Sequence, residues 1–167
     1  RNVDILTDRY QIFDGASTRN GANCTRKNPL QWSYNSGVYL LGMATMWKYV
    51  SYGLMLFSCS PYILNCLLTD CDLCIQRGED PVWRERVTNL LDTMSILFFR
   101  DGVMQEAACE PVPNCNHDQQ SFKAYTSRWL AATMKIAPWT EEKIMPLLRS
   151  SAIAAAKQCS GPGDACG

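Results

Sequence analysis

The sequence predicts an all-α fold made of helical hairpins with disulfide-held loops. Segments that are apolar at almost every position alternate with segments whose apolar residues recur at helical spacing, and turn residues separate them. No stretch alternates convincingly between apolar and polar residues, as a half-buried strand would. Hairpins packed in layers or in a ring fit this pattern, and so does a plain bundle.

The first expected helix covers residues 38–49, after the turn residues 34–37. It is apolar at almost every position up to Trp47, which predicts a helix buried on all sides. Upstream, residues 1–28 begin without Met and show no signal-peptide pattern, so we expect an internal piece of a longer chain. Residues 10–13 alternate weakly, like a short strand or an ordered loop.

Two amphipathic helices are expected next. The first follows a turn at 77–81 and covers 83–99, and the second covers 120–136. The apolar stripe of the first helix consists of Val87, Leu90, Leu91, Met94 and Phe98. The apolar stripe of the second consists of Phe122, Tyr125, Thr126, Trp129, Thr133 and Ile136.

The last helical segment begins at Thr140, where two following glutamates lie favourably near the positive end of a helix. Pro146 removes a hydrogen bond from any regular helix that contains it. The sequence therefore predicts a single turn at 140–144 and a main helix from near Pro146 to Gln158.

The composition describes one globular domain and limits its partners. The chain has 167 residues, 47% of them hydrophobic, which argues against disorder. Sixteen basic and sixteen acidic residues give a net charge of zero, so no nucleic-acid partner is expected and a neutral partner such as carbohydrate fits well. The uncharged run 49–69 is long enough to span a bilayer, but its polar residues disfavour a stable span, so a small membrane protein is the least favoured hypothesis.

Nine cysteines predict a disulfide framework in a secreted protein. Cys109 and Cys115 are close enough to close a small loop, and Cys159 and Cys166 are close enough to close another. Cys24 stands alone.

Two short motifs point in different directions. Asn23, in the tripeptide Asn-Cys-Thr, is a glycosylation acceptor by pattern, which has meaning only in a secreted chain. Cys71 and Cys74 form a C-x-x-C motif, but zinc needs two more ligands and redox chemistry needs a βαβ context. Neither is visible, so we expect no metal and no cofactor.

Four stretches together carry a family resemblance: IFDGA at 12–16, QWSYNSG at 31–37, EAACE at 106–110 and SFKAYTSR at 121–128. In them the chain resembles fungal glycoside hydrolase family 76, the mannan endo-1,6-α-mannosidases, which are usually secreted and GPI-anchored in the cell wall or at the outer face of the plasma membrane. The resemblance covers 1–49 and 77–167. It implies the C-terminal part of an (α/α)6 toroid that cleaves or transfers α-1,6-mannosidic bonds with retention, and a partner that is α-1,6-mannan or a GPI-linked mannose glycan.

One departure from the family concerns catalysis. The family uses two adjacent aspartates as nucleophile and acid/base, whereas this sequence contains no Asp-Asp dipeptide. The resemblance therefore implies that no catalytic residue lies in this chain, that a missing N-terminal half supplies the pair, and that the chain alone is inactive. A non-catalytic mannan-binding or structural remnant is the alternative, and hydrolysis and transfer both stay open.

A second departure is the segment 50–76, which has no counterpart in the family. We interpret it as a translated intron, because Val50-Ser51 suits a donor site, Leu68-Thr69 a branch sequence and Gln76 a terminal CAG, with the reading frame kept. Removing it joins Tyr49 to Arg77. The Cys109–Cys115 and Cys159–Cys166 pairs then remain, and Cys24 is left for a partner in the missing half.

The resemblance also selects candidate residues for the substrate cleft. Glu106 and Glu110 bracket Cys109, and a disulfide-held loop is a good way to fix carboxylates beside a sugar, although a solvated acidic loop is the alternative. Lys123 and Arg128 lie on opposite flanks of their helix, so at most one points directly into a cleft. Surface snorkelling is their other interpretation.

Three further candidates lie near the start of the first helix. Asp14, Tyr34 and Asn35 either cap this helix or face the cleft, and only the resemblance favours the cleft. Trp129 is among the tryptophans able to stack on sugars, although buried packing is their commoner fate. His117 is expected to be a loop residue, because this reaction class uses carboxylates.

Overall fold

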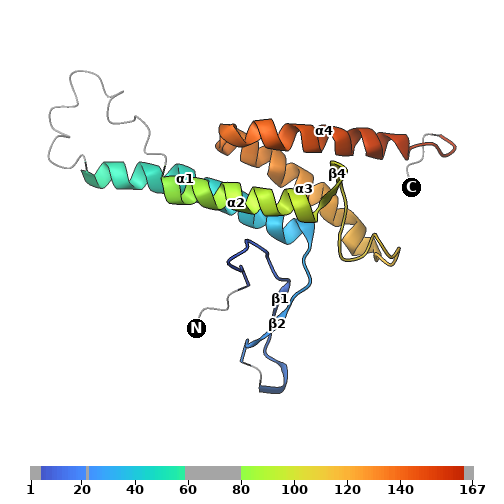
Figure 1. The fold of residues 1–167 in the computed structure, drawn as a ribbon, viewed down its shortest axis with the longest axis horizontal. Coiled ribbons are helices and arrows are strands. Elements are labelled where there is room, and N and C mark those ends of the chain that lie inside the picture. The colour runs from blue at the N-terminus through green and yellow to red at the C-terminus, as the bar shows by residue number, and fades with distance from the viewer. Residues whose placement is uncertain (1–4, 22, 59–79, 164–167) are drawn as a thin grey trace.

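The computed structural model describes residues 5–21, 23–58 and 80–163. Within these residues the all-α prediction is confirmed, since four α-helices form the body and two short antiparallel hairpins are attached to it (Figure 1). The helices are α1 Ser33–Ser58, α2 Pro81–Leu97, α3 His117–Ile136 and α4 Glu141–Lys157. The strands are β1 Gly15–Ser17, β2 Arg26–Asn28, β3 Phe99–Arg100 and β4 Val103–Met104.

Helix α1 is the centre of the arrangement, because it packs against both α2 and α3. Helices α1 and α2 lie side by side and run in opposite directions, while α4 lies over α3 and the β3–β4 hairpin (Figure 1). The core between the helices is apolar and fully enclosed. Its most completely buried side chains are Ile12, Leu40, Val87, Leu90, Met94, Phe98, Leu130 and Ile144.

Burial of α1 on all sides, as its composition predicts, is wrong for the described residues. Val38 and Met46 are 44% and 43% exposed, and both lie on a face that no described element covers. An all-apolar pattern predicts that a helix is covered on every side in the complete protein. Some of the covering elements can belong to a part of the protein outside this chain. The helix also begins earlier than expected, at Ser33.

Helix α2 begins at Pro81, two residues before the predicted start, and its Asp80 cap explains the difference. The Asp80 side chain accepts a hydrogen bond from the backbone N–H of Val82 at 2.9 Å. Proline suits the first helical position because its missing N–H would have no partner there. The predicted apolar stripe of this helix is buried as expected.

Helix α3 begins at His117 rather than Gln120, because Asn116 and Gln119 form a capping box. Asn116 Oδ1 accepts from the Gln119 N–H at 2.9 Å, and Gln119 Oε1 accepts from the Asn116 N–H at 2.8 Å. The predicted stripe needs one correction. Tyr125 is 44% exposed, and Leu130, outside the predicted stripe, is buried instead.

The predicted break of the last helix at Pro146 is wrong. A short 3₁₀ turn, Pro138–Thr140, leads directly into α4, and Pro146 lies inside that helix. The first turn of α4 carries Ile144, whose side chain is completely buried in the core. Packing of Ile144 therefore outweighs the one backbone hydrogen bond that the proline removes.

The β3–β4 hairpin is an element that the sequence prediction missed. Asp101 and Gly102 form its two-residue turn with φ of 52° and 77°, values that suit an Asp-Gly type I′ turn. The hairpin is tied to α4, since Ser150 Oγ donates to the Gly102 carbonyl and Ser151 Oγ accepts from the Met104 N–H.

Several predictions fall outside the described residues. These are most of the segment 50–76 with its C-x-x-C motif, and Cys166. No helix in the described ranges is both long and apolar enough to cross a membrane.

Candidate functional site

The candidate site lies where the beginning of α1 meets the loop 105–116 and the first half of α3, and Glu106 anchors this junction. The Glu106 Oε2 atom accepts a hydrogen bond from the backbone N–H of Ser33 at 3.1 Å, and Oε1 accepts from Ser33 Oγ. Ser33 Oγ lies 2.8 Å from Thr126 Oγ1 on α3. All three residues are buried, so the acid binds an otherwise unpaired N–H at the start of α1 and links the loop to both helices.

Burial raises the pKa of the Glu106 carboxyl above its ordinary value of 4.5, because desolvation penalises the charged form. The hydrogen bonds from Ser33 oppose this effect, the nearby charge of Glu110 adds to it, and the charge of Lys123 opposes it. The Glu106 side chain has no exposed surface. In the described structure it holds α1 in place and does not face solvent.

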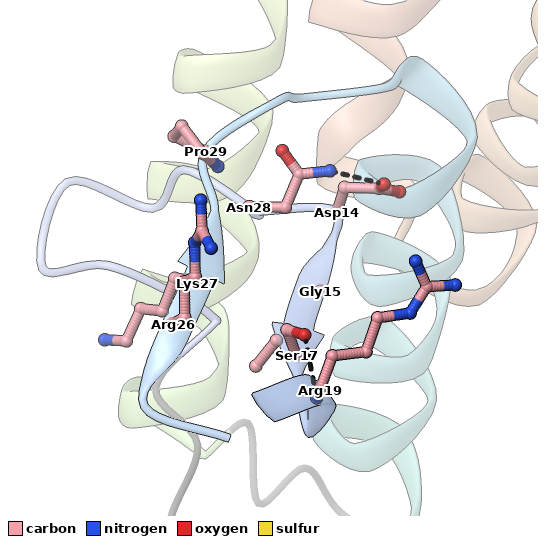
Figure 2. Close-up of a pocket in the computed structure, with 9 residues that line it drawn as sticks. Asp14, Gly15, Ser17, Arg19, Arg26, Lys27, Asn28 and Pro29 are labelled. Atoms are coloured by element: carbon pink, nitrogen blue, oxygen red, sulfur yellow. Dashed lines mark hydrogen bonds between the residues drawn. The ribbon is translucent and has the colours of Figure 1, made fainter. Parts of the chain in front are cut away.

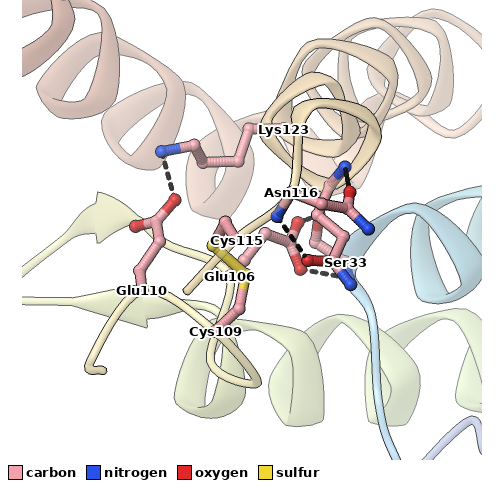
Figure 3. Close-up of a disulfide and its surroundings, with 8 residues drawn as sticks. Ser33, Glu106, Cys109, Glu110, Cys115, Asn116 and Lys123 are labelled. Carbon is pink, nitrogen blue, oxygen red and sulfur yellow. Dashed lines mark hydrogen bonds and ion pairs between the residues drawn. A yellow bond between two sulfur atoms is a disulfide. The ribbon is translucent and has the colours of Figure 1, made fainter. Parts of the chain in front are cut away.

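The predicted Cys109–Cys115 disulfide is present and closes the loop (Figure 3). Asn116, the cap of α3, follows directly, so the closed loop leads straight into the helix start. On the other side of the loop, Glu110 Oε1 lies 2.5 Å from Lys123 Nζ on α3. The disulfide, the cap and this half-exposed ion pair together hold the loop against α3.

Asp14 and Asn35, both predicted as site residues, lie together. Asp14 Oδ2 accepts from Asn28 Nδ2 at 3.0 Å, and Asp14 Oδ1 accepts from Asn35 Nδ2 at 3.3 Å. This network connects the β1–β2 hairpin to the first turn of α1. It leaves several amide and carboxylate groups near solvent, which are the group types that recognise sugar hydroxyls.

A polar hollow of about 710 Å³ lies along the β1–β2 hairpin (Figure 2). Asp14 and Asn28 lie together at one end of it, and Arg19, Arg26 and Lys27 are the cations among its other lining residues. Figure 2 shows Arg19 extending to one side of the hairpin while Arg26 and Lys27 lie on the other. The cations therefore do not converge on one point.

Aromatic rings run along the junction of α1 and α3. The Tyr34 ring lies 4.3 Å from the Phe122 ring, between centroids, and Trp32 packs edge-on to Phe122 at 5.5 Å. Further along α3, Tyr125 and Trp129 lie 6.0 Å apart with an angle of 26° between their planes. Of the remaining candidates, Arg128 and His117 are exposed, His117 as the first residue of α3.

Sequence reasoning missed four contributors to this site: Ser33, Asn28, Thr126 and the exposed ring of Tyr125. Ser33 occupies the start of a helix, where serine is common, so its position carried a usable signal. Thr126 and Tyr125 lie in an apolar stripe, and the stripe alone does not say which of its members contact a neighbouring helix.

Two further described cysteines, Cys24 and Cys159, and the glycosylation acceptor Asn23 lie outside this junction. Cys24 is a free thiol, and Asn23 beside it is exposed in the connection between β1 and β2. Cys159 is disulfide-bonded, while its predicted partner Cys166 lies outside the described residues. In the part of the chain that the structure describes, no three His, Cys, Asp or Glu residues gather as metal ligands would.

Comparison with known proteins identifies the family. The sequence profile of glycosyl hydrolase family 76 matches residues 1–53 and 71–167. The chain belongs to this family. Mannan endo-1,6-alpha-mannosidase DCW1 of Candida glabrata is 38% identical over 167 residues, which cover 99% of this chain but 30% of that protein. The DCW1 protein of Saccharomyces cerevisiae is 37% identical over 158 residues, 93% of this chain and 28% of that protein.

A solved structure agrees with this assignment. The crystal structure of Dfg5 from Chaetomium thermophilum in complex with glucosamine superposes with a TM-score of 0.77 at 36% identity, covering 99% of this chain and 34% of that one. The chain thus spans about a third or less of the length of the family 76 proteins it matches.

Proposed function

We propose that this chain forms part of the catalytic domain of a mannan endo-1,6-α-mannosidase, a secreted or cell-wall enzyme that hydrolyses or transfers α-1,6-mannosidic bonds. The observation that carries the proposal is the near-complete match of this chain to proteins named for that activity. The solved relative binds glucosamine, which supports a carbohydrate ligand. The exposed amides near Asp14 and the ring of Tyr125 offer this part of the domain a surface for sugar.

The catalytic carboxylates are proposed to lie in the part of the domain outside this chain. Retention requires two carboxyl groups about 5–5.5 Å apart, both able to reach the glycosidic bond. Glu106 is sealed in the core, and Glu110 is paired with Lys123. The chain alone is therefore proposed to be inactive, and its role is to hold one wall of the cleft.

The segment 50–76 is proposed to be an insertion rather than part of the enzyme. The family match breaks at 54–70, inside this segment, which supports the proposal. Transcript sequencing across these codons tests its origin. Reads in which the codons are spliced out are expected, and a transcript that always retains them contradicts the intron interpretation.

Activity measurement tests the main proposal. The chain is joined to the upstream region of a family 76 domain that carries an adjacent aspartate pair, and release of oligosaccharides from α-1,6-mannan is measured. The joined protein is expected to cleave or transfer, the chain alone to do neither, and a joined protein with both aspartates changed to asparagine to be inactive. Turnover by the chain alone, or none by a folded joined protein, contradicts the proposal.

A non-catalytic mannan-binding remnant is the second candidate, and the exposed Tyr125 ring, stacked on the half-buried ring of Trp129, favours it. Parallel aromatic faces stack on the apolar faces of sugars. The two candidates differ in the joined protein, where binding of mannan without cleavage supports the remnant.

A further inference from the structure

Two glycines of α1 lie in opposite environments. A Cβ atom added at Gly37 would lie 3.0 Å from Trp129 Cε3 and 3.4 Å from Thr126 Cα, so this glycine lets α3 approach closely. A Cβ added at Gly42 would meet nothing within 4 Å. Glycine weakens a helix interior, and at Gly42 no described neighbour accounts for its presence.

Gly42 lies in an apolar groove of about 1410 Å³. Val38 and Met46, one turn before and one turn after Gly42, are the exposed apolar residues of α1 noted above. The groove runs between α1, the beginning of α2 and the loop of residues 5–10. Its main apolar lining consists of Leu6, Val38, Leu41, Met43, Met46 and Trp83.

The loop wall of this groove is fixed in position. Leu6 forms an antiparallel bridge with Ile12, which is buried in the core. The Arg9 carbonyl accepts a hydrogen bond from Thr93 Oγ1 of α2 at 3.0 Å, which ties the loop to this helix. On the α2 wall, the Arg86 guanidinium lies 4.6 Å from the centre of the Trp83 ring. The groove therefore exists before any partner binds.

The proportion of the domain that lies outside this chain indicates the occupant. The alignment with the Dfg5 structure covers 99% of this chain but 34% of Dfg5. The alignment with the Candida glabrata relative covers 30% of that protein. About two thirds of each of these family 76 proteins therefore lies outside this chain and is available to cover surfaces that this chain exposes.

We propose that this groove is the docking site for an apolar-striped helix from the remaining part of the same family 76 domain, with Gly42 at the point of closest approach. The proposal rests on the proposed function, because it takes the chain to be one part of a larger enzyme. Gly42 would then let the docked helix approach α1 closely, as Gly37 does for α3. Val38 and Met46 lie on either side of the contact.

Photo-crosslinking tests the occupant. The upstream family region is co-expressed as a separate polypeptide with the full chain, which carries benzoylphenylalanine at Val38 or at Met46. The matched control places the same group at Ile96, which is 80% exposed on α2 and does not line the groove. Crosslinks to the upstream polypeptide are expected from positions 38 and 46, at least tenfold more than from position 96.

Substitution at Gly42 gives a second readout. In the chain alone, Gly42→Ala fills empty space and improves helix propensity, so the melting temperature is expected to rise by about 2–4 °C. Gly42→Trp is expected to leave the chain folded but to weaken its association with the upstream polypeptide at least tenfold. Glu85→Trp, at an exposed position of α2, is the matched control and is expected to leave association unchanged.

The outcomes separate this proposal from the proposed function. Crosslinks to a second copy of the chain, equal crosslinking from position 96, or association that survives Gly42→Trp would overturn the docking proposal, even if the joined enzyme cleaves mannan. Groove-specific crosslinks in an inactive joined protein would support docking while contradicting the enzyme. Absence of any association between the two polypeptides would also overturn the docking proposal.

Discussion

At the scale of single residues, Glu106 shows how a polar group can be identified from sequence and still be assigned the wrong surroundings. Its place in a loop expected to be held by the Cys109 disulfide predicted a fixed carboxylate, with a solvated acidic loop as the alternative. The structure fixes it, but in the core, where Ser33 supplies two hydrogen bonds. The position of a partner 73 residues away along the chain cannot be read from local pattern, because only the packing of α1 on α3 brings it near.

The buried acid makes the stability of the chain depend on pH. The folded state raises the pKa of Glu106 above 4.5, so the folded chain holds its proton more tightly than the unfolded chain. Stability is then highest below pH 4.5 as far as this group is concerned, and it falls as the pH rises through the pKa of the folded state.

The Glu106→Gln variant tests this dependence. It has no ionisable group at this position, so the free energy of unfolding in urea is expected to change less between pH 4 and pH 7 than in the wild type. Glu142→Gln, at an exposed position of α4, is the control and should retain the wild-type change. Equal pH dependence in Glu106→Gln and the wild type would show that Glu106 does not contribute.

At the scale of elements, the sequence predicted the buried faces of the helices more reliably than the residues at which the helices begin. The stripe of α2 is buried as its spacing predicts, because a period of 3.6 residues reports one packed face. The starts of α2 and α3 were each misplaced although Asp80 and the Asn116–Gln119 box were visible signals. The hairpin at Asp101-Gly102 was missed although this dipeptide strongly favours a type I′ turn.

The close packing of α1 on α3 gives a test at Gly37. An added methyl group would come within 3.0 Å of the Trp129 indole and 3.4 Å of the Thr126 backbone, so Gly37→Ala forces the helices apart. We expect a loss of about 1–3 kcal/mol in the free energy of unfolding. Urea denaturation measures it, and Gly42→Ala, the same substitution on the same helix, serves as the control. Equal effects of the two substitutions would contradict the assigned role of Gly37.

At the scale of the whole molecule, sequence could not show which faces the chain covers by itself. The apolar residues of α1 predict neighbours on all sides, and the described chain supplies them on only part of the helix. The pattern of apolar and polar residues in a helix reflects every surface that the helix contacts in the complete domain. Only the structure of this chain therefore shows that the face of α1 around Val38 is exposed and lines a groove.

The meeting of α1 and α2 supports a prediction about the segment 50–76. Trp139 contacts Trp47 of α1 at a ring distance of 4.4 Å, and Arg84 of α2 lies 4.6 Å over the same Trp139 ring. Positions 47 and 84 therefore lie at the same height along the paired helices. Because α1 and α2 run in opposite directions (Figure 1), Tyr49 lies close to the first turn of α2. A few residues are enough to join helix ends that lie this near each other.

Deleting residues 50–76 should therefore leave a sound helical hairpin. Residues 33–49 would span about 25 Å, the length that the 17 residues of α2 also span at a rise of about 1.5 Å per residue, and Arg77 to Asp80 would form the connection. We expect the deletion variant to keep the helical circular dichroism of the described helices and to melt no lower than the full chain. Loss of cooperative melting would contradict the insertion, because it would mean that the segment supports the packing of α1 on α2. A deletion of 105–116, which removes Glu106 and the loop disulfide, is the matched control and should abolish that melting.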